Sequence, residues 1–312
     1  MRYLQWIRVK VRQIDETQIG GKSILIYIPS YIKINLTLRV FVPREDGYHE
    51  IATLFHKLGP VEWLGVKKFN DPAQKDVINS HNIVISGTNI INRVIDFLRE
   101  KGIKLPPMEC DIWKILPIGS GIGAGSGNAA AMVEWLSTVH DIDLDPSELA
   151  SIGADIPFFL SKSKTALATG VGERLKLLDQ LTGIYALLAI PDKSISTAEA
   201  YRKLDEDRKK GNINIVPVSH AIYEALNIYG NLERRKKIGL LPNDFISILR
   251  KESDFYDKFF DLCNTFKSSL AWSVSGSGSS AFCLFTDKYE ALKAQEVMSS
   301  KLVEISKIFV LE

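Results

Sequence analysis

The chain has 312 residues, of which 46% are hydrophobic and 24% charged, and its formal net charge is +2 at pH 7. This size suits one large domain or two lobes, and the balance of charges predicts no broad basic face for nucleic acid. Three cysteines, Cys110, Cys263 and Cys283, are too few for a disulfide framework or a metal cluster. No stretch approaches the roughly 20 apolar residues of a membrane-spanning helix, so we expect a cytoplasmic protein without nucleic-acid or membrane partners.

The first part of the chain combines strand and helix patterns. Residues 6–12 alternate apolar and basic side chains, which predicts a strand and leaves no continuous apolar core for a signal peptide. Further strands are expected at residues 24–42, 61–66, 82–86 and 108–115. Between the last two, Asn89 to Lys101 places apolar residues at helical spacing, and Gly102 ends this helix.

A glycine-rich loop follows. Residues 119–127 read Gly-Ser-Gly-Ile-Gly-Ala-Gly-Ser-Gly, and from Asn128 an alanine-rich helix begins. Beyond it we expect a short helix at 146–152, strands at 165–169, 185–190 and 281–285, and helices at 197–204, 219–226 and 244–251. This mixture predicts an α+β protein whose second lobe begins near residue 180.

The order of strand, flexible loop and helix is the one that a phosphate site requires. The first N–H groups of a helix have no partner within it, and the helix dipole favours an anion there. The loop is not a Walker loop, because the Gly-Lys-Ser segment at residues 21–23 has Glu16 where that motif needs glycine. It also fits the dinucleotide-binding pattern poorly: from Gly121 or Gly123 the third glycine slot holds another residue type, and from Gly119 it holds Ala124, which is permitted but weaker. No strand then leads to an acid at the expected distance. A flexible loop without a ligand is the remaining alternative.

Further segments narrow the possibilities to one family. In chain order they are Lys33-Ile-Asn-Leu36, Asp46-Gly-Tyr-His-Glu50, Gly153-Ala-Asp-Ile-Pro-Phe-Phe-Leu160, Gly170-Val-Gly-Glu173 and Ser275-Gly-Ser-Gly278. With the glycine loop, they resemble the motifs of the diphosphocytidyl-methylerythritol kinases of the galactokinase, homoserine kinase, mevalonate kinase and phosphomevalonate kinase (GHMP) superfamily. The resemblance covers roughly residues 26 to 285.

The resemblance implies a two-lobed α+β GHMP kinase fold, with a ribosomal protein S5 domain 2-like N-terminal lobe and a ferredoxin-like C-terminal lobe. The ATP-binding domain would span residues 24–178 and the C-terminal domain residues 179–312, with residues 1–23 as an extension that is an extra strand or an artefact of the start site. The implied activity is ATP-dependent phosphorylation of the 2-hydroxyl of 4-diphosphocytidyl-2-C-methyl-D-erythritol in the non-mevalonate isoprenoid pathway. ATP and Mg²⁺ would be the cofactors, the partner a small molecule linked to cytidine diphosphate, and the protein a monomer or weak homodimer.

The resemblance also implies roles for individual residues. Asp155 would be the general base, and Lys33 would keep it ionised and stabilise developing charge. The predicted ATP contacts are Asn89, Pro117, Gly119, Gly121, Gly123, Gly125, Ser126 and Asn128. The predicted substrate contacts are Asn35, Tyr48, His49, Thr197, Tyr201, Gly276 and Gly278, with the two tyrosines stacking on cytosine and His49 contacting its polar edge. No residue is predicted to ligate a metal.

Two positions depart from the family pattern. Gly127 stands where the family has a second serine, which removes a hydroxyl, and Ala124 replaces a glycine that could adopt a positive φ at little cost. Both changes are expected to weaken ATP binding. The alternatives are a GHMP kinase for homoserine or mevalonate, against which Tyr48 and Tyr201 argue, and a catalytically silent nucleotide-binding homologue, against which Lys33 and Asp155 argue.

Overall fold

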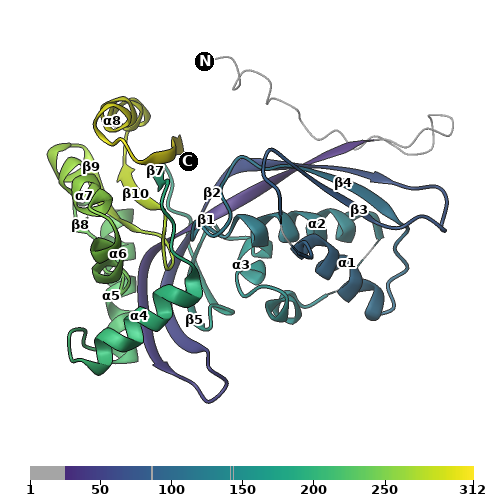
Figure 1. The fold of residues 1–312 in the computed structure, drawn as a ribbon, viewed down its shortest axis with the longest axis horizontal. Helices are drawn as coiled ribbons and strands as arrows, with labels where there is room; N and C mark the ends of the chain where they lie inside the picture. Colours follow the sequence, from purple (N-terminus) through teal and green to yellow (C-terminus); the bar gives the residue numbers. More distant parts are fainter. Residues whose placement is uncertain (1–24, 86, 141, 143) are drawn as a thin grey trace.

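The computed structural model describes residues 25–85, 87–140, 142 and 144–312. These residues form two sheets with helices packed against each, so the predicted α+β class is confirmed (Figure 1). The strand predicted at residues 6–12 lies outside the described residues. Among the helices that the structure describes, none combines the length and the apolar character needed to cross a membrane.

A long antiparallel hairpin runs through the first sheet. Its strands, β1 (Ile26–Pro43) and β2 (His49–Lys68), pair from Ile26 opposite Val66 to Pro43 opposite His49. The other strands are β3 (Val77–His81), β4 (Met108–Trp113), β5 (Thr165–Gly170) and β6 (Arg174–Leu178), in the order β3-β4-β2-β5-β6. Because β4 pairs with the end of β2 and β5 with its beginning, the hairpin connects the two halves of this sheet.

One face of the first sheet carries a group of helices (Figure 1). They are α1 (Ile90–Glu100), α2 (Ala124–His140), a 3₁₀-helix η1 (Pro146–Ser151) and α3 (Ile156–Leu160). Apolar residues of these helices pack against the sheet in one cluster, and α2 lies directly on β1. The residues of α2 from Gly127 to Val133 are all buried, so the helix enters the core directly after its first turn, in which Gly125 is exposed.

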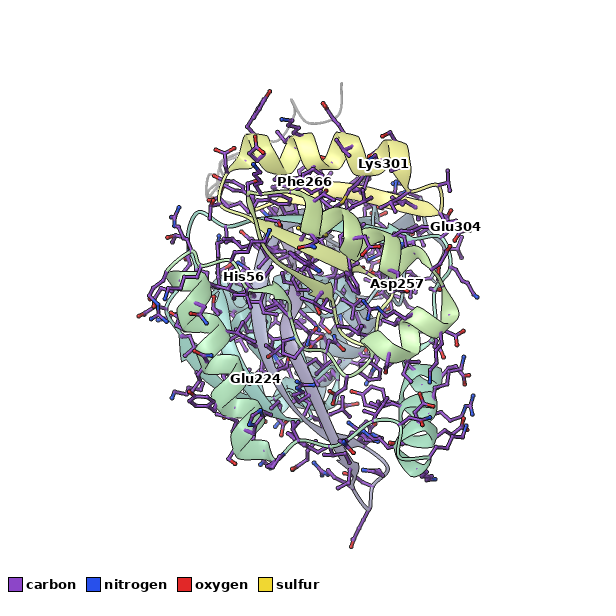
Figure 2. All side chains as sticks on the ribbon, turned by 90° about the vertical axis from the view of Figure 1, so that its left-hand side faces the viewer. His56, Glu224, Asp257, Phe266, Lys301 and Glu304 are labelled. Carbon is purple, nitrogen blue, oxygen red and sulfur yellow. The ribbon has the colours of Figure 1, made fainter. Side chains whose placement is uncertain are left out.

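The second sheet has the order β11-β7-β10-β9-β8. Its strands are β7 (Tyr185–Pro191), β8 (Gly239–Leu240), β9 (Ser269–Val274), β10 (Ala281–Phe285) and β11 (Ile305–Leu311). The helices of this lobe are α4 (Thr197–Lys209), α5 (Val218–Glu233), α6 (Ile246–Glu252), α7 (Phe255–Thr265) and α8 (Lys288–Lys301). Figure 2 looks onto this lobe, with Lys301 at the end of α8 and Glu224 on α5 at opposite sides of it.

The two sheets share hydrophobic cores. Ile34 and Leu36 of β1 lie in one cluster with Leu188 of β7 and Phe282 of β10, and Leu38 lies in a second cluster with residues of α4, α6, α7 and α8. The first sheet ends at Leu178 and the second begins at Tyr185, so the predicted division at residues 178 and 179 falls between the sheets. The division into two domains remains a prediction, because β1 packs in the hydrophobic clusters of both sheets.

Several predicted elements differ from the structure. The strand predicted at residues 82–86 is wrong for residues 82–85, and residue 86 lies outside the described residues. Strand β3 ends at His81, because Asn82 has a φ of 70°, a left-handed conformation that breaks extended backbone. The sequence pattern predicts no element at β3, β6, β8, β9, β11, α3, α7 or α8. In α8 the buried residues are Ala291, Ala294 and Met298, and such small or flexible side chains produce only a weak amphipathic pattern.

Candidate active site

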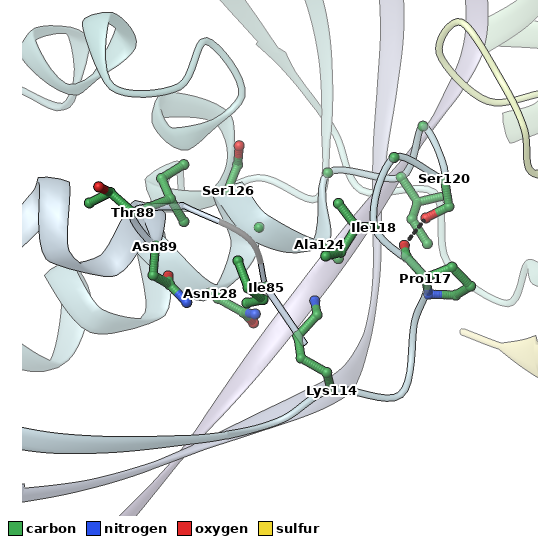
Figure 3. Close-up of a pocket in the computed structure, with 16 residues that line it drawn as sticks. Ile85, Thr88, Asn89, Lys114, Pro117, Ile118, Ser120, Ala124, Ser126 and Asn128 are labelled. Atoms are coloured by element: carbon green, nitrogen blue, oxygen red, sulfur yellow. Dashed lines mark hydrogen bonds between the residues drawn. The ribbon is translucent and has the colours of Figure 1, made fainter. Parts of the chain in front are cut away.

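All eight residues predicted to contact ATP line one cavity of about 360 Å³ (Figure 3). The glycine loop forms one wall, and residues 85 and 88–90 at the start of α1 form another. The first turn of α2 begins at Ala124 on the cavity wall, so its N–H groups and the positive end of its dipole belong to the cavity. An anion such as a nucleotide phosphate suits this position.

Three glycines shape the loop. Gly119, Gly121 and Gly123 have φ values of 75°, 75° and 68°, which side-chain-bearing residues rarely adopt. At Gly121 the space is also closed: an added Cβ would overlap the carbonyl oxygen of Ser275 and lie 2.5 Å from that of Gly278. Glycine is therefore required at position 121 for both conformation and close approach.

The C-terminal glycine segment holds the phosphate loop in place. Ser275 Oγ donates to the Gly121 carbonyl at 2.9 Å, and both Nα and Oγ of Ser280 donate to the Ser120 carbonyl, at 3.1 and 2.6 Å. Gly276 has a φ of 59°, and an added Cβ there would lie 2.9 Å from the Gly121 oxygen. The structure therefore places this segment against the loop, and its predicted contact with substrate remains a prediction.

Lys33 and Asp155 meet beside the loop. Lys33 Nζ lies 3.5 Å from Asp155 Oδ2, donates to Asn35 Oδ1 at 2.7 Å, and lies 4.8 Å from the ring centre of Phe55. The backbone N–H of Lys33 donates to the Ile122 carbonyl at 2.9 Å, which ties β1 to the phosphate loop. The ammonium group is nearly buried, with 7% of its side chain exposed, and the carboxylate is its charge partner.

Asp155 begins α3 without acting as a side-chain cap. It occupies the N-cap position, yet its carboxylate makes no capping hydrogen bond, and 25% of the side chain is exposed. Gly172 of the Gly170–Glu173 motif lies next to it, because an added Cβ there would be 4.0 Å from Oδ1. One carboxylate oxygen faces Lys33 and the group is open to a ligand, which is the arrangement that a general base needs.

Asn35 lies in the interior rather than in an open cleft. It is 2% exposed, its amide donates to Thr53 Oγ1 at 2.8 Å, and its backbone N–H donates to Ser275 Oγ at 3.2 Å. Its side-chain oxygen is the acceptor for Lys33. These contacts make Asn35 the residue that orients Lys33, and its predicted contact with substrate remains a prediction.

The residues predicted to bind cytosine lie between the hairpin and α4. The ring centres of His49 and Tyr201 are 4.9 Å apart, and Tyr201 packs edge-on against Phe245. Burial raises the pKa of Tyr201 to about 12, with the charge of Asp155 as a smaller cause, so its hydroxyl stays protonated. Tyr48 is 66% exposed, and among the described residues no ring contact joins it to Tyr201.

Thr197, at the start of α4, accepts a hydrogen bond from Ser277 Oγ at 3.2 Å, so it lies beside the C-terminal glycine segment.

A buried charge cluster beside the cavity was missing from the predicted site. Glu62 accepts from Lys114 Nζ at 2.7 Å, from Asn128 Nδ2 at 3.0 Å, and from the backbone N–H groups of Ile115 and Leu116 at 3.1 Å. Its carboxylate thus joins the segment before the loop to the helix after it. A lone acid within the apolar run Val61 to Val66 is the pattern that could have identified it.

Two of the predicted ATP contacts also have structural partners. Asn89 caps α1 by accepting from the Ile91 N–H at 3.0 Å, and Asn128 is 3% exposed and donates to Glu62. Asn128 Oδ1, in contrast, is buried without a hydrogen-bond partner, although the residue lines the cavity. A buried acceptor without a partner is costly, so a ligand N–H at this wall would stabilise the site.

Of the two departures from the family pattern, Ala124 lines the cavity and Gly127 is not among its lining residues. Gly127 has no positive φ, and an added Cβ would overlap the carbonyl oxygen of Tyr31 on β1. A side chain at position 127 would therefore point at β1 and not at a phosphate. Ala124 is the first residue of α2 and needs no positive φ. The physical reasons for expecting weaker ATP binding at these two positions are absent from the structure.

Comparisons with known proteins agree on one family. Residues 89–164 match the GHMP kinases N terminal domain. A 4-diphosphocytidyl-2-C-methyl-D-erythritol kinase of Thermoanaerobacter pseudethanolicus is 33% identical over 276 residues, covering 87% of this chain and 91% of that protein. A kinase of the same name from Prochlorococcus marinus is 32% identical over 284 residues, which cover 89% of this chain and 91% of that protein.

Solved structures extend the agreement to the fold. A crystal structure of 4-(cytidine 5'-diphospho)-2C-methyl-D-erythritol kinase superposes with a TM-score of 0.72 at 25% identity, covering 92% of this chain and 99% of that one. A homoserine kinase from Cytophaga hutchinsonii has a TM-score of 0.60 at 16% identity over 95% of this chain and 96% of its own. That second likeness concerns the fold alone.

Proposed function

This chain belongs to the 4-diphosphocytidyl-2-C-methyl-D-erythritol kinases, a family within the GHMP kinases, and we propose that it transfers the γ-phosphoryl group of ATP to the 2-hydroxyl of 4-diphosphocytidyl-2-C-methyl-D-erythritol. The observation that carries the proposal is the Lys33–Asp155 pair beside the glycine loop, with Nζ and Oδ2 3.5 Å apart. The reaction would be a phosphorylation step in the synthesis of isoprenoid precursors.

The cavity supplies the nucleotide half of the reaction. The N-terminal end of α2 would hold the phosphates, and Asn128 lies on the wall of the same cavity. Mg²⁺ would enter with ATP, neutralise phosphate charge and keep most of its ligands from phosphate and water. Among the described residues no group of three His, Cys, Asp or Glu side chains could hold a metal ion.

Lys33 and Asp155 supply the acceptor half. Asp155 would accept the proton of the 2-hydroxyl as the new oxygen–phosphorus bond forms and the bond between the β- and γ-phosphates breaks, releasing ADP. The Asp155 side chain is 25% exposed and makes no capping hydrogen bond, so its carboxylate is accessible to the substrate hydroxyl. Lys33 would then stabilise the negative charge on the transferring oxygens.

The cluster around His49 supports a cytidine-linked substrate over homoserine or mevalonate. His49 and Tyr201 pack on each other, and the neighbouring Tyr48 exposes its ring on the hairpin. Stacking of a base on an aromatic ring contributes about 1–3 kcal/mol. Neither small alcohol carries a base. A catalytically silent nucleotide-binding homologue would not need the Lys33–Asp155 pair, so the presence of this pair argues against that alternative.

The proposal is tested by turnover. Purified protein is incubated with the cytidine-linked substrate, ATP and Mg²⁺ while ADP release is followed, and Asp155→Asn is expected to lower kcat by about 10²–10⁴-fold. Asp257→Asn is the matched control, because this acid lies on α7 and pairs with Arg250 at the surface (Figure 2). Turnover of the wild type no faster than that of Asp155→Asn, or faster turnover of homoserine or mevalonate, contradicts the proposal.

A further inference from the structure

The imidazole of His49 is held by two residues of α4. Tyr201 and Asp205 are four positions apart, so they lie on the same face of the helix. The Tyr201 ring packs at 4.9 Å from the imidazole centre, and His49 Nε2 lies 3.0 Å from both Oδ1 and Oδ2 of Asp205. The histidine side chain is only 7% exposed, so the carboxylate contact decides how the ring is placed.

The symmetric contact also decides where the ring carries its proton. Both carboxylate oxygens of Asp205 are acceptors, so Nε2 must be the N–H donor in the neutral ring. The other nitrogen, Nδ1, is then a bare acceptor, and among the described residues no protein group bonds to it. An imidazole in the opposite tautomer would set a lone pair of Nε2 against the carboxylate, which is repulsive.

We propose that Asp205 is a positioning residue that fixes the orientation and tautomer of His49, so that Nδ1 accepts a hydrogen bond from the amino group of a cytosine base. This inference rests on the function proposed above. Cytosine carries an amino donor at the position where uracil carries a carbonyl acceptor, and a fixed acceptor on the protein favours the first and repels the second. Asp205 thereby contributes to the choice of base without touching it.

A purely structural role for Asp205 would be to attach α4 to the hairpin. That attachment is already supplied one turn further along, where Arg208 donates to the Val40 carbonyl at 2.5 Å and pairs with Asp244 at 3.0 Å. Asp244 also accepts from the backbone N–H of Val40 at 2.9 Å. Removal of the Asp205 carboxylate therefore leaves α4 anchored, and its effect should pass through His49.

The experiment measures binding of CDP and UDP by the full-length protein, together with kcat and the KM values for substrate and ATP. Asp205→Ala is expected to weaken CDP binding and raise the substrate KM about 10-fold, with kcat and the KM for ATP within about 2-fold. The preference for CDP over UDP should shrink. Asp205→Asn keeps an acceptor oxygen for Nε2–H and should restore most of the preference. Glu206→Gln, at the exposed neighbouring position that pairs with Arg202, is the matched control.

A double-mutant cycle with His49→Ala separates positioning from stability. In the His49→Ala background, Asp205→Ala should have no further effect on the CDP preference, because the group that it positions is gone. An equal loss in both backgrounds, or a CDP preference unchanged by Asp205→Ala, overturns the inference alone. A wild-type protein that binds CDP no better than UDP overturns the function proposed above and the inference with it.

Discussion

Gly127 is the position where the structure makes the sharpest prediction. It lies inside α2, where replacing glycine by alanine normally stabilises a helix by about 0.5–1 kcal/mol. Here the added Cβ would overlap the Tyr31 carbonyl oxygen and lie 3.1 Å from its carbonyl carbon, and β1 is fixed nearby by the hydrogen bond from Lys33 N to Ile122 O. Overpacking of this kind costs about 1–3 kcal/mol.

The overlap involves backbone on both sides, so the upper part of that range applies, and Gly127→Ala should lower the free energy of unfolding by about 1–2 kcal/mol after the helix gain is subtracted. Urea unfolding followed by circular dichroism measures this change. Gly125→Ala is the control, because its Cβ would meet only Ile90 Cγ2 at 3.9 Å and should leave stability unchanged or slightly higher. Stabilisation by Gly127→Ala would refute the inference that this glycine serves the contact between α2 and β1.

Three further predictions concern the loop, the charge pair and a buried histidine. Gly121→Ala should displace the loop from the Gly278 carbonyl and weaken ATP binding at least about 10-fold in calorimetry, and unchanged binding would contradict the loop contact. Lys33→Met should lower kcat by about 10²-fold or more and change the KM for ATP less, because Lys33 would stabilise charge in the transition state. Steady-state kinetics measure both constants, and equal changes in kcat and in the KM for ATP would indicate a binding role instead. Burial lowers the pKa of His56 to about 4, so the unfolded chain binds its proton first and stability falls as pH drops from about 6.5 towards 4. At pH 5 this loss is about 2 kcal/mol, and His56→Gln should remove it from the pH dependence of urea unfolding, whereas an unchanged slope would contradict it.

Local patterns in the sequence predict much of the fold. The long strand β1 and the apolar helix α1 are set by residues close together in the chain, and the structure places them near the expected positions. The order of strand, loop and helix is also confirmed, but the helix expected from Asn128 begins at Ala124, inside the glycine run. Lys33 was identifiable because a lysine on an apolar strand needs a charge partner. Its partner, Asp155, follows only from the family motif, because no local pattern brings together two residues so far apart in the chain.

The remaining part of the site depends on long-range packing. The contact of Ser275 with Gly121 spans 154 positions, and the junction made by Glu62 joins β2 to both sides of the loop. Asp205 belongs to the exposed face of a strongly polar helix when the sequence is considered alone, and only the position of the hairpin shows that it faces His49. Such pairings need the register of β1 and β2 and the place of α4, neither of which local periodicity contains.

The glycines of the loop show most directly why a sequence pattern understates the structure. Gly119 has a φ of 75° with no atom near its missing side chain, so it serves the turn alone. Gly121 combines the same φ with a close approach to Ser275, and Gly127 has no unusual φ but leaves room for β1. The sequence records one residue type for three different physical demands. Position 127 therefore cannot be judged as a lost ligand for phosphate: the glycine there lets α2 lie against β1, and that packing holds the helix start at the cavity where phosphate would bind.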